Sequence, residues 1–142
     1  MIGMGILQPA IGLMIWTMVM WAWMYATRIP AMSRAAVDLD RLANDPEMTL
    51  ERALPADVQW KAHNYNHLHE QPTLFYAVAV VLAIIGQGDG TTALLGWIYL
   101  GLRVLHSLVQ STANRIQVRF ILFALSSLVL IALIAKAALA VF

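Results

Sequence analysis

The chain has 142 residues, of which 61% are hydrophobic and 12% charged, and its formal net charge is +1. A soluble domain carries about 25% charged residues, so this composition excludes an ordinary soluble domain and predicts a small membrane protein with several spans. The near-neutral charge argues against nucleic acid as a partner, and the absence of cysteine excludes disulfides, thiolate metal sites and a cysteine nucleophile in the protein itself.

The first predicted element is a membrane span over residues 5–27. Residues 1–27 carry no charged side chain, so the basic segment that precedes the apolar part of a signal peptide is missing. The apolar run is also longer than the roughly 7–15 residues usual for such a peptide. A spanning helix needs about 20 mostly apolar residues, and we therefore expect a retained span.

A long polar loop follows over residues 28–61, with Pro30, Pro46 and Pro55 as breakers. Within it, "DPEMTLERAL" offers Asp45 as an N-cap ahead of Pro46, which is compatible with a short surface helix. The alternative, an ordinary solvated connector, is the interpretation that the pattern favours.

Three further spans are predicted over residues 63–85, 92–111 and 118–141. Segments such as "ILFALSSLVLIALIA" do not alternate between polar and apolar residues, so we expect helices rather than the strands of a β-barrel. A single domain over residues 1–142, built as an all-α four-transmembrane-helix bundle, follows from these spans.

Basic residues indicate the orientation of the four spans. Asp89 is the only charge in the tight loop "GQGDGTT", whereas the other two loops and the helix ends beside them are basic. The positive-inside rule then predicts cytoplasmic loops, with both termini on the outer side, which in a bacterial inner membrane is the periplasmic side. The basic residues on the cytoplasmic side are Arg28, Arg34, Arg41, Arg52, Lys61, Arg115 and Arg119.

The densest polar cluster lies at the start of the second span, in "WKAHNYNHLHEQPTLFYAVAVVLAIIG". On one continuous helix, His63, Asn66, His67 and Glu70 would share a face. An ionisable group inside a span normally faces the bundle interior or a water-filled cavity, so Glu70 requires a partner there.

The remaining spans supply polar groups at the same depth. Arg103, His106 and Gln110 share one face of the third span, Arg119 begins the fourth, and Arg28 ends the first. We expect a polar belt near the cytoplasmic surface, with Glu70 and Arg103 paired directly or through one side chain or water.

Two interpretations of this belt remain open. Basic residues near helix ends often only anchor the helix at the headgroups, which we favour for Arg28, Lys61 and Arg115. Glu70, Arg103 and Arg119 together exceed what one ion pair needs, and they favour a pocket. Histidines four residues apart also form a possible metal-binding face, but no second histidine cluster accompanies them, and we expect no metal.

Two segments carry a family resemblance. "NYNHLHEQPTLFY" (residues 64–76) resembles the second-helix signature of bacterial MAPEG proteins, the membrane-associated proteins in eicosanoid and glutathione metabolism. "LRVLHSLVQSTANRIQVRF" (residues 102–120) resembles the third-helix and fourth-helix region of the same family. The resemblance implies a homotrimer with glutathione bound between subunits near the cytoplasmic face.

The resemblance also implies roles for individual residues. Arg119 matches the arginine that holds the thiolate and is the expected catalytic residue. The residues expected to bind glutathione as co-substrate are Arg28, His67, Glu70, Arg103, His106 and Gln110. Two departures stand out: His67 replaces the usual asparagine, and Gln110 replaces a tyrosine that contacts the tripeptide.

Two functions follow from the sequence. The first is a glutathione-dependent transferase or peroxidase acting on lipophilic small molecules that arrive from membrane lipid. The alternative is a non-enzymatic structural or lipid-binding membrane trimer that has lost the glutathione site.

Overall fold

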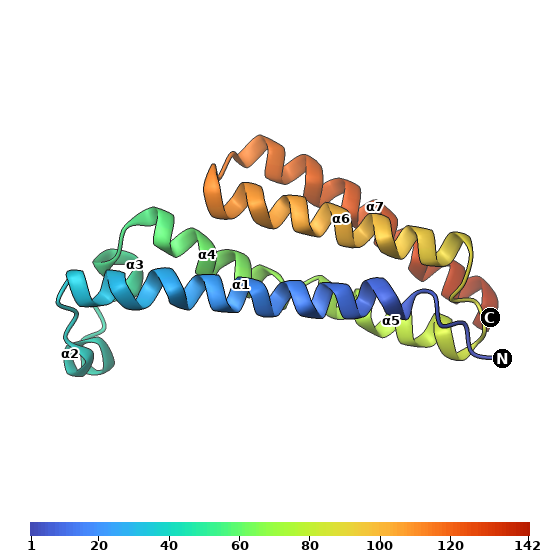
Figure 1. The fold of residues 1–142 in the computed structure, drawn as a ribbon, viewed down its shortest axis with the longest axis horizontal. Coiled ribbons are helices and arrows are strands. Elements are labelled where there is room, and N and C mark those ends of the chain that lie inside the picture. The colour runs from blue at the N-terminus through green and yellow to red at the C-terminus, as the bar shows by residue number, and fades with distance from the viewer.

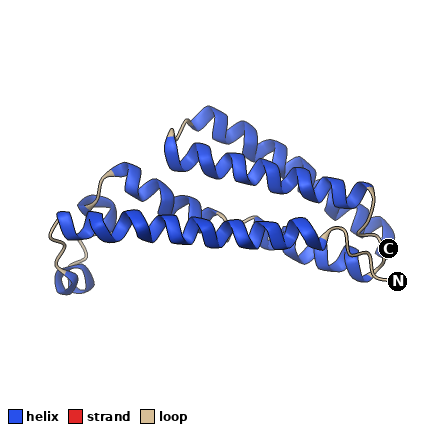
Figure 2. Cartoon of the chain, viewed as in Figure 1, coloured by secondary structure: helices blue, strands red, loops and turns tan.

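The computed structural model describes residues 1–142 as an all-helical chain without strands (Figures 1 and 2). The helices, in chain order, are α1 (Leu7–Arg34), α2 (Leu39–Asn44), α3 (Leu50–Ala53), α4 (Ala56–His67), α5 (Pro72–Ile84), α6 (Thr91–Thr112) and α7 (Ile116–Val141).

Three helices, α1, α6 and α7, are long and apolar enough to cross a membrane. They confirm the predicted helical character of residues 5–27, 92–111 and 118–141, and α1 continues to Arg34. Large apolar side chains on their outer faces are exposed, including Met18, Leu128 and Ile131. An outer surface of this kind suits lipid rather than water, and the protein is an integral membrane protein.

The second predicted span, over residues 63–85, is not one helix. The chain forms α4 and α5 with a break between them, and α5 alone, with 13 residues, is too short to cross the bilayer. Pro72, the first residue of α5, has no N–H to donate and its ring excludes the carbonyl of Leu68 from a regular turn. Both helices nevertheless pack along α1, one after the other (Figure 1).

The polar connector contains two short helices. Asp38 caps α2 by accepting hydrogen bonds from the N–H groups of Asp40 and Arg41. Asp45 does not begin a helix as considered above, because it ends α2 and its carboxylate accepts from the N–H of Glu47 in a turn. Thr49 instead caps the single turn of α3.

The termini lie together at the end of the molecule opposite α2 and α3 (Figure 1). There the N-terminal segment is held by two hydrogen bonds: the Gly3 N–H donates to Ala83 O at 2.9 Å, and the Gly5 N–H donates to Asp89 Oδ1 at 2.7 Å. The single acidic side chain of this end therefore fastens α1 to the loop before α6.

The core lies between α1, α5, α6 and α7. Phe75 and Tyr99 are fully buried, and their rings stack with centroids 4.4 Å apart. Along the contact between α1 and α6, Gly96 lies directly beneath Ile6 and Pro9. A small residue at a helix crossing lets two backbones approach closely, which is the main source of packing energy in lipid.

We predict that Gly96→Ala destabilises the protein by about 1–3 kcal/mol, because the added Cβ would overpack this crossing. The Cβ would lie 2.8 Å from Pro9 Cγ. Unfolding of the detergent-solubilised protein with increasing denaturing detergent measures the loss.

Gly101→Ala is the matched control, since it lies on the same helix and a Cβ there meets nothing within 4 Å. It should leave stability unchanged or slightly raised, by up to about 1 kcal/mol of helix propensity. Equal effects of the two substitutions would show that the α1–α6 contact does not depend on Gly96.

Candidate functional site

The end of α4, the middle of α6 and the start of α7 meet at a pocket of ≈ 370 Å³. It combines two imidazoles and one guanidinium with an apolar and aromatic wall. Its lining residues are His67, His106, Ile116, Arg119, Phe120 and Phe123.

The imidazoles lie against one another and against the aromatic wall. The ring centroids of His67 and His106 are 5.0 Å apart, and those of His67 and Phe123 are 5.6 Å apart. His106 is 2% exposed, and its Nδ1 has no hydrogen-bond partner. The His106 ring therefore keeps one nitrogen without a partner beside the pocket, while the faces of both rings are packed.

Arg119 forms the cationic part of the pocket. One terminal nitrogen donates to Asn114 Oδ1 at 2.7 Å, and this bond holds the side chain across the start of α7. Its Nε is buried without a partner. A guanidinium held in this way can donate to an anion without first losing side-chain freedom.

Arg103 lies behind the pocket, fully enclosed by the protein. Its only hydrogen bond is a long one, 3.5 Å from Nη2 to the backbone oxygen of His67, and no carboxylate lies within ion-pair distance. Nε and Nη1 have no partner. A buried charge without an opposite charge is costly, so Arg103 is a candidate for ligand binding rather than for stability.

The prediction of a direct pair between Glu70 and Arg103 is wrong. Because α4 ends at His67, Glu70 leaves the shared helical face, and its side chain is 68% exposed. Its carboxylate lies 3.1 Å from His67 Nδ1 instead. His67 thus connects the two groups, through its ring to Glu70 and through its backbone oxygen to Arg103.

The predicted site residues therefore fall into three groups. His67, His106 and Arg119 line the pocket, with Glu70 at its edge through His67. Arg103 and Gln110 are buried on the same face of α6. Arg28 lies apart on α1, which contributes no residue to the pocket.

Sequence reasoning did not select several buried polar side chains of this region. Asn64 is fully enclosed, and neither atom of its amide has a partner. Gln71 receives a hydrogen bond from Tyr99 and donates one to Ser127, at 3.2 and 2.7 Å. Tyr99 and Ser107 lie four residues before and after Arg103 on the same face of α6, so helical spacing alone would have found them.

Comparison with known proteins gives one match. The model of the MAPEG family matches residues 6–139. Neither the curated proteins nor the solved structures contain a match.

We predict that Arg103→Met leaves the melting temperature in detergent unchanged or raises it. Replacing a buried, unpaired cation by an apolar side chain of similar volume removes a desolvation penalty, which is worth about 1–4 kcal/mol in comparable cases. The same variant should lose binding of any anionic ligand. A large drop in melting temperature would instead show that Arg103 has an anionic partner inside the folded protein.

Proposed function

Because the chain belongs to the MAPEG family, we propose that it is a glutathione-dependent transferase or peroxidase that acts on lipophilic electrophiles. The observation that carries this proposal is the pocket itself. It combines the Arg119 guanidinium and two imidazoles with the apolar rings of Phe120 and Phe123. A thiol and an apolar electrophile need these two environments next to each other.

The proposed chemistry is thiolate attack. A free thiol has a pKa of about 8.5, and a nearby cation favours the thiolate, which is the reactive form. Arg119 would hold the sulfur through the guanidinium N–H groups that Asn114 does not use. In the transferase reaction the sulfur forms a bond to the electrophilic carbon, and the leaving group departs with its electron pair.

Polar side chains in and behind the pocket suit the rest of the tripeptide. Glutathione carries two carboxylates and one ammonium group. Arg103, His106 and Gln110 are donors on one face of α6, and Glu70 presents an exposed carboxylate that would take the ammonium. Arg28, which lies outside the pocket of its own chain, would come from a neighbouring copy.

A homotrimer would also cover polar groups that one chain leaves exposed. Four polar side chains from α4, the break after it and the start of α5 are exposed: His63, Asn66, Glu70 and Thr73. Exposed polar side chains on a membrane helix are costly in lipid, and a neighbouring copy removes that cost. We propose that α4 and α5 together form the second of four crossings, with these four side chains turned towards the other subunits.

One observation supports the non-enzymatic alternative. Gln110 replaces the tyrosine that the resemblance leads one to expect, and its Oε1 is buried without a partner. A structural or lipid-binding trimer would need no thiol. Conjugation of glutathione to 1-chloro-2,4-dinitrobenzene by the purified protein separates the two functions, and a thermal-shift screen against glutathione and other thiols identifies the co-substrate.

We predict that Arg119→Lys folds normally but loses at least about 90% of thiol-dependent activity. Lysine keeps the charge but not the planar set of donors that can hold Asn114 and a thiolate together. Initial rates at saturating glutathione measure the loss.

Arg115→Lys is the control, because Arg115 is exposed at the position just before α7, four residues ahead of Arg119, and lines no part of the pocket. It should retain nearly full activity. Equal, small losses in both variants of an active protein would move the thiolate site away from Arg119.

We predict that Asn66→Cys allows cross-linking between subunits by a short bis-maleimide, with a trimer as the largest product. The chain contains no native cysteine, so each introduced thiol reports one position. Leu128→Cys, on the exposed outer face of α7, should give no cross-linked trimer. A protein that stays monomeric in native mass spectrometry, with no cross-link at Asn66, contradicts the assembly.

A further inference from the structure

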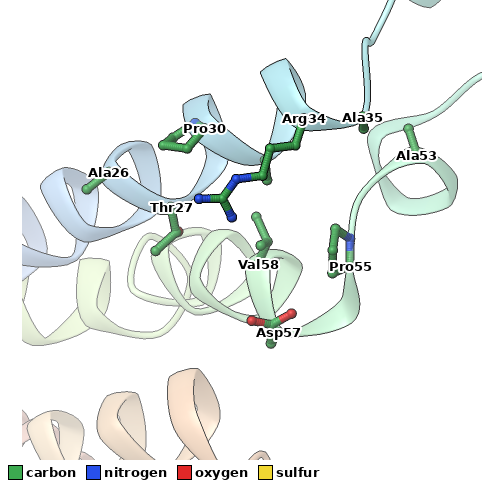
Figure 3. Close-up of a pocket in the computed structure, with 10 residues that line it drawn as sticks. Ala26, Thr27, Pro30, Arg34, Ala35, Ala53, Pro55, Asp57 and Val58 are labelled. Atoms are coloured by element: carbon green, nitrogen blue, oxygen red, sulfur yellow. The ribbon is translucent and has the colours of Figure 1, made fainter.

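A second hollow lies on the other side of α4, between the last turns of α1 and the start of α4. It has a volume of ≈ 580 Å³, and its lining residues include Pro30, Ala31 and Val58. Figure 3 shows Arg34 extending back along α1 towards Thr27, while Asp57 lies on the first turn of α4. The hollow shares no lining residue with the proposed thiol pocket.

The two charged side chains of this hollow form no ion pair within the protein. Neither the Arg34 guanidinium nor the Asp57 carboxylate has an ion-pair partner, although both line the same space. Pro30, inside α1, cannot donate the regular helical hydrogen bond to the carbonyl of Ala26, which also lines the hollow. The hollow thus offers one donor group of positive charge and, separately, one carboxylate.

The length of α1 places this hollow at the membrane surface. Its 28 residues extend about 42 Å, whereas the hydrocarbon core is about 30 Å thick. The first charged residue of the chain is Arg28, so the turns after it project into the headgroup region. A polar hollow at this depth lies beside the lipid headgroups.

An apolar hollow continues along the same face of α1 towards the membrane centre. It has a volume of ≈ 470 Å³ and is lined only by Met14, Ile15, Met18, Val19 and Ala22. Ala22 precedes Ala26 by four residues, so the two hollows lie on one helical face, one turn apart. A polar hollow followed by an apolar one complements the headgroup and the acyl chain of a phospholipid.

We infer that this face of α1 and α4 binds one phospholipid with a phosphoethanolamine headgroup. Arg34 donates to the phosphate, and the primary ammonium donates to the Asp57 carboxylate. An acyl chain follows the apolar hollow. A choline headgroup has no N–H to donate, and a glycerol headgroup has no cation for Asp57, so the groove distinguishes between these lipids.

Native mass spectrometry of the full chain in detergent, with equimolar phosphatidylethanolamine, phosphatidylcholine and phosphatidylglycerol of the same acyl chains, tests the inference. The wild-type protein should retain phosphatidylethanolamine in clear excess over the other two. Arg34→Gln and Asp57→Asn should each reduce its retention to the level of phosphatidylcholine. Equal retention of the three lipids by the wild type, or an unchanged preference in Arg34→Gln, overturns the inference.

Arg41→Gln is the matched control, since Arg41 is an exposed arginine of the same connector that pairs with Asp45 outside the groove. It should keep the wild-type preference. Soluble glycerophosphoethanolamine should not displace the lipid, because it lacks the chain that the apolar hollow holds; displacement at equal concentration would assign the site to a free headgroup and overturn the lipid assignment.

Coverage by a second copy of the chain is the remaining alternative. Ala26→Cys puts a single thiol in the groove of a protein without native cysteine. In the delipidated protein this thiol should react with a maleimide, and added phosphatidylethanolamine should slow the reaction. A thiol that stays unreactive without lipid would show that protein covers the groove. Neither result depends on glutathione binding.

Discussion

The hydrocarbon interior of a membrane offers no hydrogen-bond partner, and Arg103 shows how this protein meets that constraint. Its guanidinium is completely enclosed, and it receives one backbone oxygen but no carboxylate. Around it lie the other buried polar side chains of α6, which include His106, Ser107 and Gln110. A charge enclosed at this level and left largely unsatisfied makes the region a candidate ligand site rather than a source of stability.

The break between α4 and α5 is part of the same arrangement. In a continuous helix the carbonyl of His67 would accept from the N–H of Gln71. Here it accepts from Glu70 at 3.2 Å and from Arg103 at 3.5 Å. The break also directs the Gln71 side chain to Tyr99 on α6 and Ser127 on α7. Pro72 therefore shapes the site without touching it, by making a carbonyl and an amide available to the neighbouring helices.

Helix α4 connects two regions with different chemistry. It packs against both α1 and α6, and each contact borders a hollow. On the side of α6 and α7, the pocket combines imidazoles, a guanidinium and phenyl rings, which suits the proposed thiol chemistry on apolar molecules. On the side of α1, Arg34 and Asp57 carry opposite charges beside an apolar hollow, which suits the proposed zwitterionic lipid. A membrane protein that takes its second substrate from the bilayer benefits from keeping these two surfaces separate.

Composition and periodicity alone determined much of this protein. The low charge and the apolar runs predicted the membrane location and four helical spans, three of which are helices long enough to cross a membrane, and two segments indicated the family. Spacing on α6 correctly grouped Arg103, His106 and Gln110, because a long regular helix preserves the geometry that spacing assumes. The same reasoning failed at Glu70, where it assumed a helix that Pro72 interrupts.

Only the tertiary structure decided which polar groups meet. It placed His67 between Glu70 and Arg103, moved Arg28 away from the pocket, and enclosed Asn64, whose burial no periodic pattern had indicated. It also formed the groove of Arg34 and Asp57, which come from residues 23 positions apart in a connector that looked like an ordinary solvated loop. Sequence spacing describes neighbours on one helix, whereas these sites depend on the distances between helices, and those are set by packing at small residues such as Gly96.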